Sequence, residues 1–151
     1  MATVNIRLDK YRTRKQTKLI NMLNDKSVQR QVNTYIKDAI TPYVPMRSGA
    51  LRRSAIVTHS SITWGRGLPY AKYQYEGVAY KPSLPITESG SLVDFYSIPG
   101  RQKYRSTQKL QYSVPGTRDH WDEAFKGFVR LRTNQQITRY LKAECKRRGL
   151  R

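Results

Sequence analysis

The sequence has very little of the chemistry that builds disulfide scaffolds or metal sites. It contains 1 cysteine and 2 histidines in 151 residues. Cys145 has no second cysteine to pair with, which excludes a disulfide scaffold and favours a cytosolic product. His59 and His120 lie far apart in the sequence, whereas a zinc site needs three or four closely placed ligands. We therefore expect no metal and no cofactor.

Membrane spans and catalytic motifs are also missing. No apolar run approaches the ~18 residues of a membrane span, and the first residues show neither a signal-peptide core nor an acylation motif. There is no P-loop and no dinucleotide-binding glycine pattern. The one acidic cluster, Asp119, Asp122 and Glu123, is explained by helix capping and the helix dipole. We expect no membrane contact and no catalysis; an enzyme using His120 with Asp119 or Asp122 is the least favoured alternative.

Positive charge is what the sequence has in excess. Lys and Arg number 29 against 10 Asp and Glu, which gives a formal net charge of +19. The cations are spread over residues 7–18, 47–53, 101–109 and 126–151, and such a charge attracts nucleic acid in a salt-dependent way. The 11 tyrosines interleaved with these cations suit docking onto an acidic protein surface equally well. Composition leaves both alternatives open.

Amphipathic helices are predicted in the first part of the chain. Residues 10–23 form a basic helix ending near Asn24. The clearest period of 3.6 runs over residues 25–40, where Asp25 is the expected N-cap and Pro42 stops the helix. Its apolar stripe consists of Val28, Val32, Tyr35, Ile36, Ala39 and Ile40.

Helix returns over residues 119–147. Thr117 or Asp119 is the expected cap, a break is expected near residues 130–133, and Gly149 ends the helix. The first apolar stripe carries Trp121, Ala124, Phe125 and Phe128, and the second carries Ile137, Tyr140, Leu141 and Cys145.

Short elements fill the middle of the chain. Ser48 is expected to cap a helical turn over 49–54, and Pro69 to open a short helix that Gly77 closes. Periodicity fades over 78–118, which we interpret as an extended hairpin or arm with a turn at Glu88–Ser91; a disordered loop is the alternative. Alternating patterns predict strands at 3–8, 55–58 and 61–64.

These elements together predict one domain over residues 1–151 of the α+β class. A small antiparallel sheet, including strands 3–8, 55–58 and 61–64, is expected to pack against amphipathic helices 25–40 and 119–147. The 78–118 arm projects from it towards neighbouring molecules.

Four short segments follow one another along the chain. They read Tyr-Val-Pro-Met-Arg-Ser-Gly-Ala-Leu-Arg-Arg-Ser at 43–54, Leu-Pro-Tyr-Ala-Lys-Tyr-Gln-Tyr-Glu-Gly at 68–77, Ser-Val-Pro-Gly-Thr at 113–117 and His-Trp-Asp-Glu-Ala at 120–124. Together with the flanking helices, they resemble the minor capsid proteins of tailed bacteriophages, a family related to neck and tail-completion proteins. The signature and interface residues of this resemblance are Pro45, Ser48, Gly49, Ala50, Leu51, Arg52, Pro69, Tyr70, Ala71, Tyr73, Gly77, Pro115, Gly116, His120 and Trp121.

In physical terms these segments are turns and caps. Gly49 is expected to permit an unusual backbone angle where Pro45 fixes the direction of the chain. Tyr70, Tyr73 and Tyr75 place amphipathic rings on and beside a short helix. Such an arrangement favours a scaffold for subunit contacts over a ligand pocket.

The resemblance implies a non-catalytic virion protein at the head–tail junction, made in the host bacterial cytoplasm. It implies a homo-oligomeric ring around the DNA channel, between the head-side connector or head-closure proteins and the tail-terminator or tail-tube proteins. Each subunit of a ring shows two different faces, and we expect the 78–114 arm to supply one of them. The alternative is a small basic protein that binds nucleic acid without sequence readout, with residues 7–18 and 130–148 holding phosphate. Whether the basic faces meet channel DNA or acidic neighbours is open.

Overall fold

Helix α2 (Lys26–Ile40) packs against both the helix before it and the C-terminal helix. The structure is a computed structural model that describes residues 14–81, 83–97, 100 and 102–150. The prediction for α2 is confirmed. Asp25 is its N-cap, and its Oδ1 accepts a hydrogen bond from the Ser27 amide at 2.8 Å. The α-helix ends at Ile40, and a single 3₁₀ turn, η2 (Thr41–Tyr43), carries Pro42. Proline therefore ends the helix as its ring geometry dictates.

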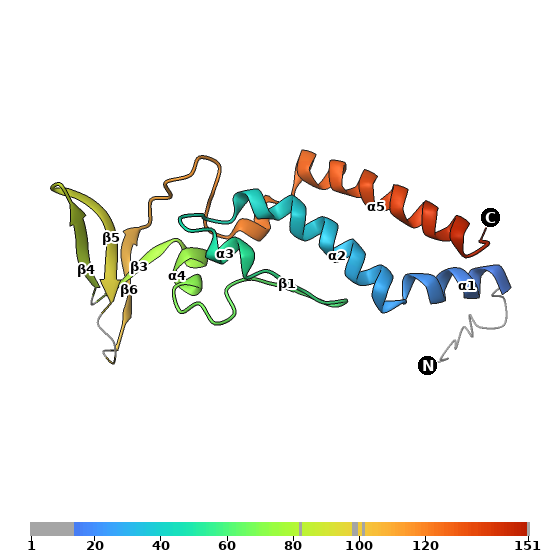
Figure 1. The fold of residues 1–151 in the computed structure, drawn as a ribbon, viewed down its shortest axis with the longest axis horizontal. Helices are drawn as coiled ribbons and strands as arrows, with labels where there is room; N and C mark the ends of the chain where they lie inside the picture. The colour runs from blue at the N-terminus through green and yellow to red at the C-terminus, as the bar shows by residue number, and fades with distance from the viewer. Residues whose placement is uncertain (1–13, 82, 98–99, 101, 151) are drawn as a thin grey trace, which may run out of the picture.

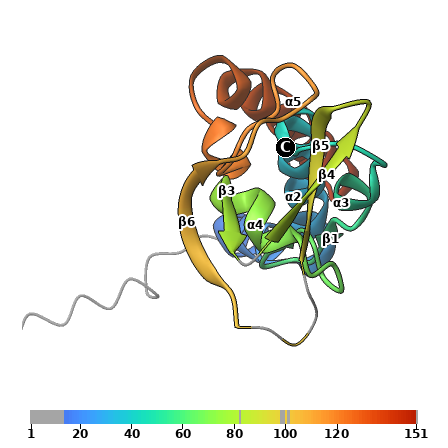
Figure 2. The ribbon, with the colours of Figure 1, turned by 90° about the vertical axis from the view of Figure 1, so that its left-hand side faces the viewer.

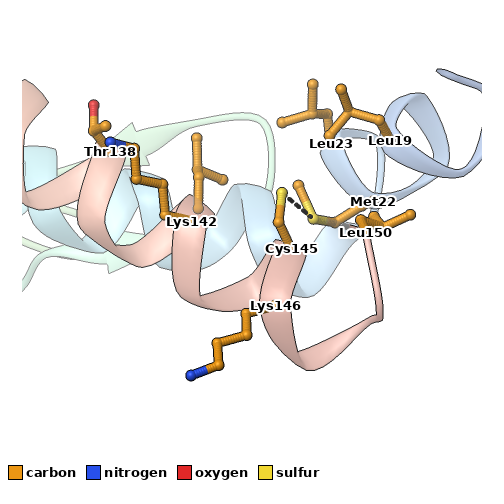
Figure 3. Close-up of a pocket in the computed structure, with 9 residues that line it drawn as sticks. Leu19, Met22, Leu23, Thr138, Lys142, Cys145, Lys146 and Leu150 are labelled. Atoms are coloured by element: carbon orange, nitrogen blue, oxygen red, sulfur yellow. Dashed lines mark hydrogen bonds between the residues drawn. The ribbon is translucent and has the colours of Figure 1, made fainter. Parts of the chain in front are cut away.

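Helix α1 (Arg14–Leu23) precedes α2 and meets the end of α5 (Gly127–Arg147). It confirms the described part of the basic helix predicted over 10–23. Met22 is buried at this corner, with its Sδ 3.7 Å from Cys145 Sγ (Figure 3). An apolar groove of about 460 Å³ lies beside the contact. It is lined by Leu19, Met22, Leu23, Thr138, Leu141, Lys142, Cys145, Lys146 and Leu150.

The C-terminal helical region breaks at a different place from the one predicted. A 3₁₀ turn, η3 (Trp121–Ala124), ends before Phe125, and α5 then runs unbroken through residues 130–133. The physical reason is local, because Gly127 at φ +51° lets the chain change direction early, while 130–133 contains no helix breaker. Neither Thr117 nor Asp119 caps η3, which follows His120 in the left-handed region.

The other end of α5 confirms the role predicted for Gly149. Its φ is +67°, its amide donates to the Lys146 carbonyl, and the Leu150 amide donates to the Cys145 carbonyl at 2.8 Å. This pair of bonds is the Schellman motif, which satisfies carbonyls left open at a helix end.

Two short helices lie between α2 and the arm. Helix α3 (Ala50–Arg53) confirms the turn predicted over 49–54, but its N-cap is Gly49 and not Ser48 as predicted. Ser48 Oγ accepts a long bond of 3.4 Å from the Ala50 amide. Helix α4 (Ala71–Glu76) ends at Gly77 as predicted. It begins two residues later than predicted, because Pro69 lies in a tight turn where the Ala71 amide donates to the Leu68 carbonyl.

The strands confirm the α+β class, but their pairing differs from the single sheet expected. The described residues form three separate two-stranded antiparallel sheets. Strands predicted at 55–58 and 61–64 are present, and their hairpin lies on α2, where Asn33 Nδ2 donates to the Thr58 carbonyl at 3.0 Å. The strand predicted at 3–8 lies outside the described residues. The pairs are β1 (Ile56–Val57) with β2 (Ile62–Thr63), β3 (Val78–Lys81) with β6 (Tyr104–Lys109), and β4 (Ser83–Glu88) with β5 (Ser91–Ser97).

The region predicted as an extended arm contains the last two of these sheets. Ser89 and Gly90 both have positive φ between β4 and β5, as a tight two-residue hairpin turn requires, which confirms the predicted turn. Strands β3 and β6 are the elements of the arm that the sequence analysis did not predict individually. After β6 the chain returns without regular structure, held by the Leu110 amide on the Gly77 carbonyl at 2.8 Å.

The molecule is elongated, with α1, α2 and α5 at one end and the β4–β5 and β3–β6 strand pairs at the other (Figure 1). The β4–β5 hairpin lies at the end farthest from the C-terminus, and α3 and α4 lie between it and the helical end (Figure 1). Helix α5 lies on one side of α2, whereas β1 and α4 lie on the other side, and the second view agrees (Figure 2).

Candidate functional site: the hub of the signature segments

The signature segments, distant in sequence, meet in one small core that we call the hub. Leu51 from α3, Ala71 from α4 and Trp121 from η3 are buried there together with Ile40 and Val44. Around them pack Ile36, Tyr43, Trp64, Leu68, Tyr75 and Phe125. Three of the four segments thus contribute to the same cluster: the first supplies two buried side chains, Val44 and Leu51, and the second and fourth supply one each.

Arg52 links two parts of the hub through hydrogen bonds to backbone carbonyls and is not a free surface cation. Its Nε donates to the Val44 carbonyl at 2.9 Å, and one terminal nitrogen donates to the Pro42 carbonyl at 2.8 Å. Both acceptors lie in the segment that leaves α2, where Pro42 interrupts the helical hydrogen-bond ladder. Arg53, next along the chain, makes one bond to the Ser48 carbonyl at 3.0 Å. Part of the basic run at 47–53 is therefore used to hold the fold.

All three signature glycines have a left-handed backbone, and two of them, Gly49 and Gly77, lie at the hub. Gly49 has φ +77°, which confirms the unusual angle expected next to Pro45. Gly77 has φ +67°, and a Cβ added there would lie 2.7 Å from the Cβ of Asp119. The close approach continues in the backbone, because the His120 amide donates to the Tyr75 carbonyl at 2.9 Å. Gly77 therefore lets the end of α4 touch the segment that leads into η3.

Tyr75 joins α4 to η3 through both its ring and its hydroxyl. The ring meets Trp121 edge-on, with centroids 4.9 Å apart and planes at 84°, and lies 4.8 Å from the His120 ring. The hydroxyl donates to Asp122 Oδ1 at 2.9 Å, and this bond, with burial, raises the pKa of Tyr75. Edge-to-face pairs add about 0.5–1.5 kcal/mol beyond burial of their area. The aromatic contact stabilises the hub.

A second tyrosine ties the chain that returns from the arm to the hub. The Tyr112 hydroxyl donates to the Gln74 carbonyl at 2.7 Å. Burial, helped by the charge of Asp119, raises the pKa of Tyr112 to about 12. The sequence analysis did not predict the role of Tyr112, the contact of Asp119 with Gly77, or the hydrogen bonds from Arg52 to two backbone carbonyls. Each of these roles depends on a partner that is distant in the sequence.

The structure brings most of the predicted signature residues into or beside the hub, in three degrees of burial. Pro115 and Gly116 are exceptions, since they lie in the loop that precedes η3. Buried residues are Pro45, Gly49, Leu51, Ala71, Gly77 and Trp121; intermediate ones are Ala50, Arg52, Tyr73 and His120; exposed ones are Ser48, Pro69, Tyr70, Pro115 and Gly116.

A hollow of about 510 Å³ opens beside the hub, and we call it the hub hollow. Its walls come from β2, the turn before α4, α4 itself and η3. The lining residues are Ile62, Thr63, Trp64, Gly65, Leu68, Pro69, Ala71, Lys72, Tyr75, Trp121 and Asp122. The walls are thus mainly apolar and aromatic, with one carboxylate.

Charge is distributed unevenly over the described residues. At the end of α5, Arg147 pairs with Glu144 at 2.6 Å and Arg148 with Asp25 at 2.7 Å, so part of this cation cluster is neutralised. No residue that the structure describes forms an ion pair with five other cations of α5. These are Arg130, Arg132, Arg139, Lys142 and Lys146.

Phe128 is not part of the core stripe in which the sequence analysis placed it. Its side chain is 77% exposed, because the break before α5 turns it away from Trp121. Leu131 is 64% exposed on the same helix. The apolar stripe of residues 121–128 fits an uninterrupted helix, and Gly127 is the one sequence signal for the break.

Within the described ranges, no three His, Cys, Asp or Glu side chains gather as metal ligands would. His120 Nδ1 lies 3.8 Å from Asp119, beyond hydrogen-bond distance. None of the helices described is long and apolar enough to cross a membrane.

Comparison with known proteins agrees with the structural character of the hub. No curated protein and no solved structure matches the chain. The family model described as minor capsid protein matches residues 4–139, which include the hub, the arm and the first half of α5. Because this match covers most of the chain, the protein belongs to the minor capsid protein family and is a structural component of the bacteriophage virion.

Proposed function

We propose that the protein is a neck component of a tailed bacteriophage, forming part of the connector ring that joins the DNA-filled head to the tail. The family match supports a virion protein, and the division of the molecule into a hub and an outlying pair of two-stranded sheets supports a joining role within it. One part holds the fold while another remains available to neighbours.

The observation that carries the proposal is the set of open strand edges in the arm. Within the described residues, β3 pairs only with β6, and β4 pairs only with β5. Each of the four strands therefore keeps one edge unpaired by any described strand. Unpaired edges accept a strand from another chain through main-chain hydrogen bonds. In this proposal the arm contacts a neighbouring head-side connector, head-closure, tail-terminator or tail-tube protein.

Gold-labelled antibody imaging of intact particles tests the location. We expect label at the head–tail junction. Label absent from particles, with the protein abundant in the lysate, contradicts the neck role and directs attention to an assembly factor that leaves before maturation. Label spread over the head surface contradicts it as well.

Deletion of residues 80–112 tests the arm. We expect helical circular dichroism to be retained, because the deletion contains no residue of the hub core cluster. Joining of heads to tails should be lost. Loss of the helical signal contradicts the separation of arm from hub, and normal joining contradicts the role of the arm.

A second candidate, nucleic-acid binding without sequence readout, is favoured by the unpaired cations of α5. Binding to duplex DNA should then survive near-physiological salt, with a logarithmic salt slope of about −0.9 for each phosphate neutralised. If binding is lost at that salt concentration, the result contradicts this candidate and favours a role of the positive charge in contacts with acidic neighbouring proteins.

A further inference from the structure

An exposed apolar pair stands at the start of α5. Phe128 and Leu131 are 77% and 64% exposed. They are three residues apart, and Arg132 follows at the fourth position, so all three side chains lie on one helix face. We call this set the α5 knob. Aromatic, apolar and arginine side chains in one patch are typical of the anchor residues of protein interfaces.

Charge decides which of two apolar hollows suits the knob. The groove between α1 and α5 carries Lys142 and Lys146, and Figure 3 shows these two lysines beside it. Those cations would repel Arg132, and like charges placed together across an interface are costly. The hub hollow instead carries Asp122, a carboxylate beside the aromatic walls of Tyr75 and Trp121.

Asp122 is available for a cation from outside. It accepts one hydrogen bond, from the Tyr75 hydroxyl, and forms no ion pair with any residue that the structure describes. The other rim charge, Lys72, is already 3.8 Å from Glu76. A carboxylate has room for further donors, and an arginine binds it with well-defined geometry. The hub hollow therefore combines apolar walls for the apolar side chains of the knob with a carboxylate for its arginine.

The hollow is large enough for an aromatic anchor. Its volume of about 510 Å³ lies within the range of ~300–1,000 Å³ that is usual for pockets holding drug-sized ligands. Trp64, Leu68 and Trp121 line it, so an inserted phenylalanine would meet aromatic and aliphatic walls. Aromatic rings bury about 150–250 Å² each and dominate the energetics of interfaces.

The position of the two features indicates a contact between copies. In both views α5 lies on one side of α2, and α4, which forms a wall of the hollow, lies on the other (Figures 1 and 2). Knob and hollow also contain different residues. A contact between two different patches is heterologous, and it generates a ring when the rotation closes.

We infer that the α5 knob of one copy inserts into the hub hollow of the next, with Arg132 beside Asp122. This inference rests on the proposed ring and names the two faces that build it. It leaves the hairpin arm free for neighbours outside the ring.

Sedimentation of the purified full chain tests the contact at about 0.15 M salt, where screening acts over ~8 Å and reduces the repulsion between strongly basic copies. Phe128→Asp should raise the dissociation constant of self-association by about 30-fold or more, as expected for loss of an interface anchor. Gln136→Asp is the matched control, because it adds the same charge at an exposed position of α5 outside the knob. We expect this control to associate like the unaltered chain.

A mixing experiment tests whether the contact is heterologous. Thr63→Arg, at an exposed position on the rim, blocks the hollow and leaves the knob intact, whereas Phe128→Asp leaves the hollow intact. Each variant alone should remain monomeric. Their mixture should form one-to-one dimers and nothing larger, since only one competent knob meets one competent hollow. Circular dichroism of each variant checks that the fold is retained.

Two outcomes overturn the inference. One is an unaltered chain that stays monomeric; the other is folded variants that associate as well as the unaltered chain. Either result is separate from the neck role, because gold label at the head–tail junction would still support the proposed function. Label absent from particles, with the mixing result obtained, would overturn the neck role alone and leave the contact standing.

Discussion

Replacement of Gly77 by alanine is expected to damage the hub more than the same change at another left-handed glycine. Gly77 has φ +67° and Gly116 has φ +82°, so both substitutions force an L-residue into an unfavourable backbone conformation. That conformation costs about 1–2 kcal/mol per residue. At Gly116 the added Cβ meets nothing within 4 Å, whereas at Gly77 it lies 2.7 Å from the Cβ of Asp119. The two variants share the backbone cost, and the clash is added only at Gly77.

The clash cannot be relieved by a side-chain rotation. A Cβ is fixed to its own backbone, so the Asp119 backbone must move, and it leads directly to the His120 amide that bonds to Tyr75. Overpacking of this kind costs about 1–3 kcal/mol. We expect Gly116→Ala to lower the free energy of unfolding by about 1–2 kcal/mol and Gly77→Ala by about 2–5 kcal/mol.

Urea denaturation followed by tryptophan fluorescence and by circular dichroism measures this difference, since both tryptophans of the chain lie in or against the hub. The double variant Gly77→Ala with Asp119→Gly should recover most of the extra loss, because the second change removes the Cβ that clashes. Equal losses for Gly77→Ala and Gly116→Ala would refute the reasoning, as would a double variant no more stable than Gly77→Ala alone.

Three further predictions concern Arg52, the helical corner and the arm. Arg52→Gln should lower the unfolding free energy by about 2–4 kcal/mol in the same urea assay, because two carbonyls lose a charged donor. The control Arg53→Gln loses one exposed hydrogen bond and should change the unfolding free energy by less than about 1 kcal/mol. Bonds from Ser27 and Arg148 hold the pKa of Asp25 far below its ordinary value of 3.8, so its contribution is present above that pH and is lost on acidification below it. Thermal melting should therefore show a smaller drop between pH 5 and pH 2.5, about the range over which carboxylates protonate, in Asp25→Asn than in the unaltered chain. The chain lacking 80–112 should still self-associate in sedimentation, and a strictly monomeric deletion variant would assign the subunit contact to the arm.

The helices and turns whose signals are local could be predicted from the sequence. Asp25, the apolar stripe after it and Pro42 define α2, and the turn between β4 and β5 follows from Ser89 and Gly90. What could not be predicted depends on partners distant in sequence. Strand β6 reads Tyr-Arg-Ser-Thr-Gln-Lys, with no apolar alternation, and it forms only because β3 lies beside it. The division into three small sheets follows from the same cause.

The candidate site shows the same division. The resemblance identified the segments that form the hub, but not what their residues do there. In the sequence Arg52 is one cation among many, and its role follows only from the two carbonyls that lie beside it in the structure. Likewise Asp119 is only an acidic neighbour of His120 in the sequence, and its contact with Gly77 follows only from the fold. Phe128 fits a core stripe in the sequence, but the break in the backbone before α5 removes it from the core. In each case the decisive contact joins elements that the sequence places 8 to 42 residues apart or depends on one torsion angle.

The burial of the signature residues distinguishes residues that stabilise the fold from residues that contact other molecules. Leu51, Ala71, Gly77 and Trp121 hold the hub together, so the signature describes how the protein folds. The arm and the α5 knob lie outside the signature, whereas the hub hollow is lined in part by the signature residues Pro69, Ala71 and Trp121. We expect contact with other molecules at these three surfaces. Variants of the hub should therefore lose stability before they lose assembly, whereas variants of the arm or knob should lose assembly at unchanged stability. A knob variant that unfolds the chain would show that this separation is wrong.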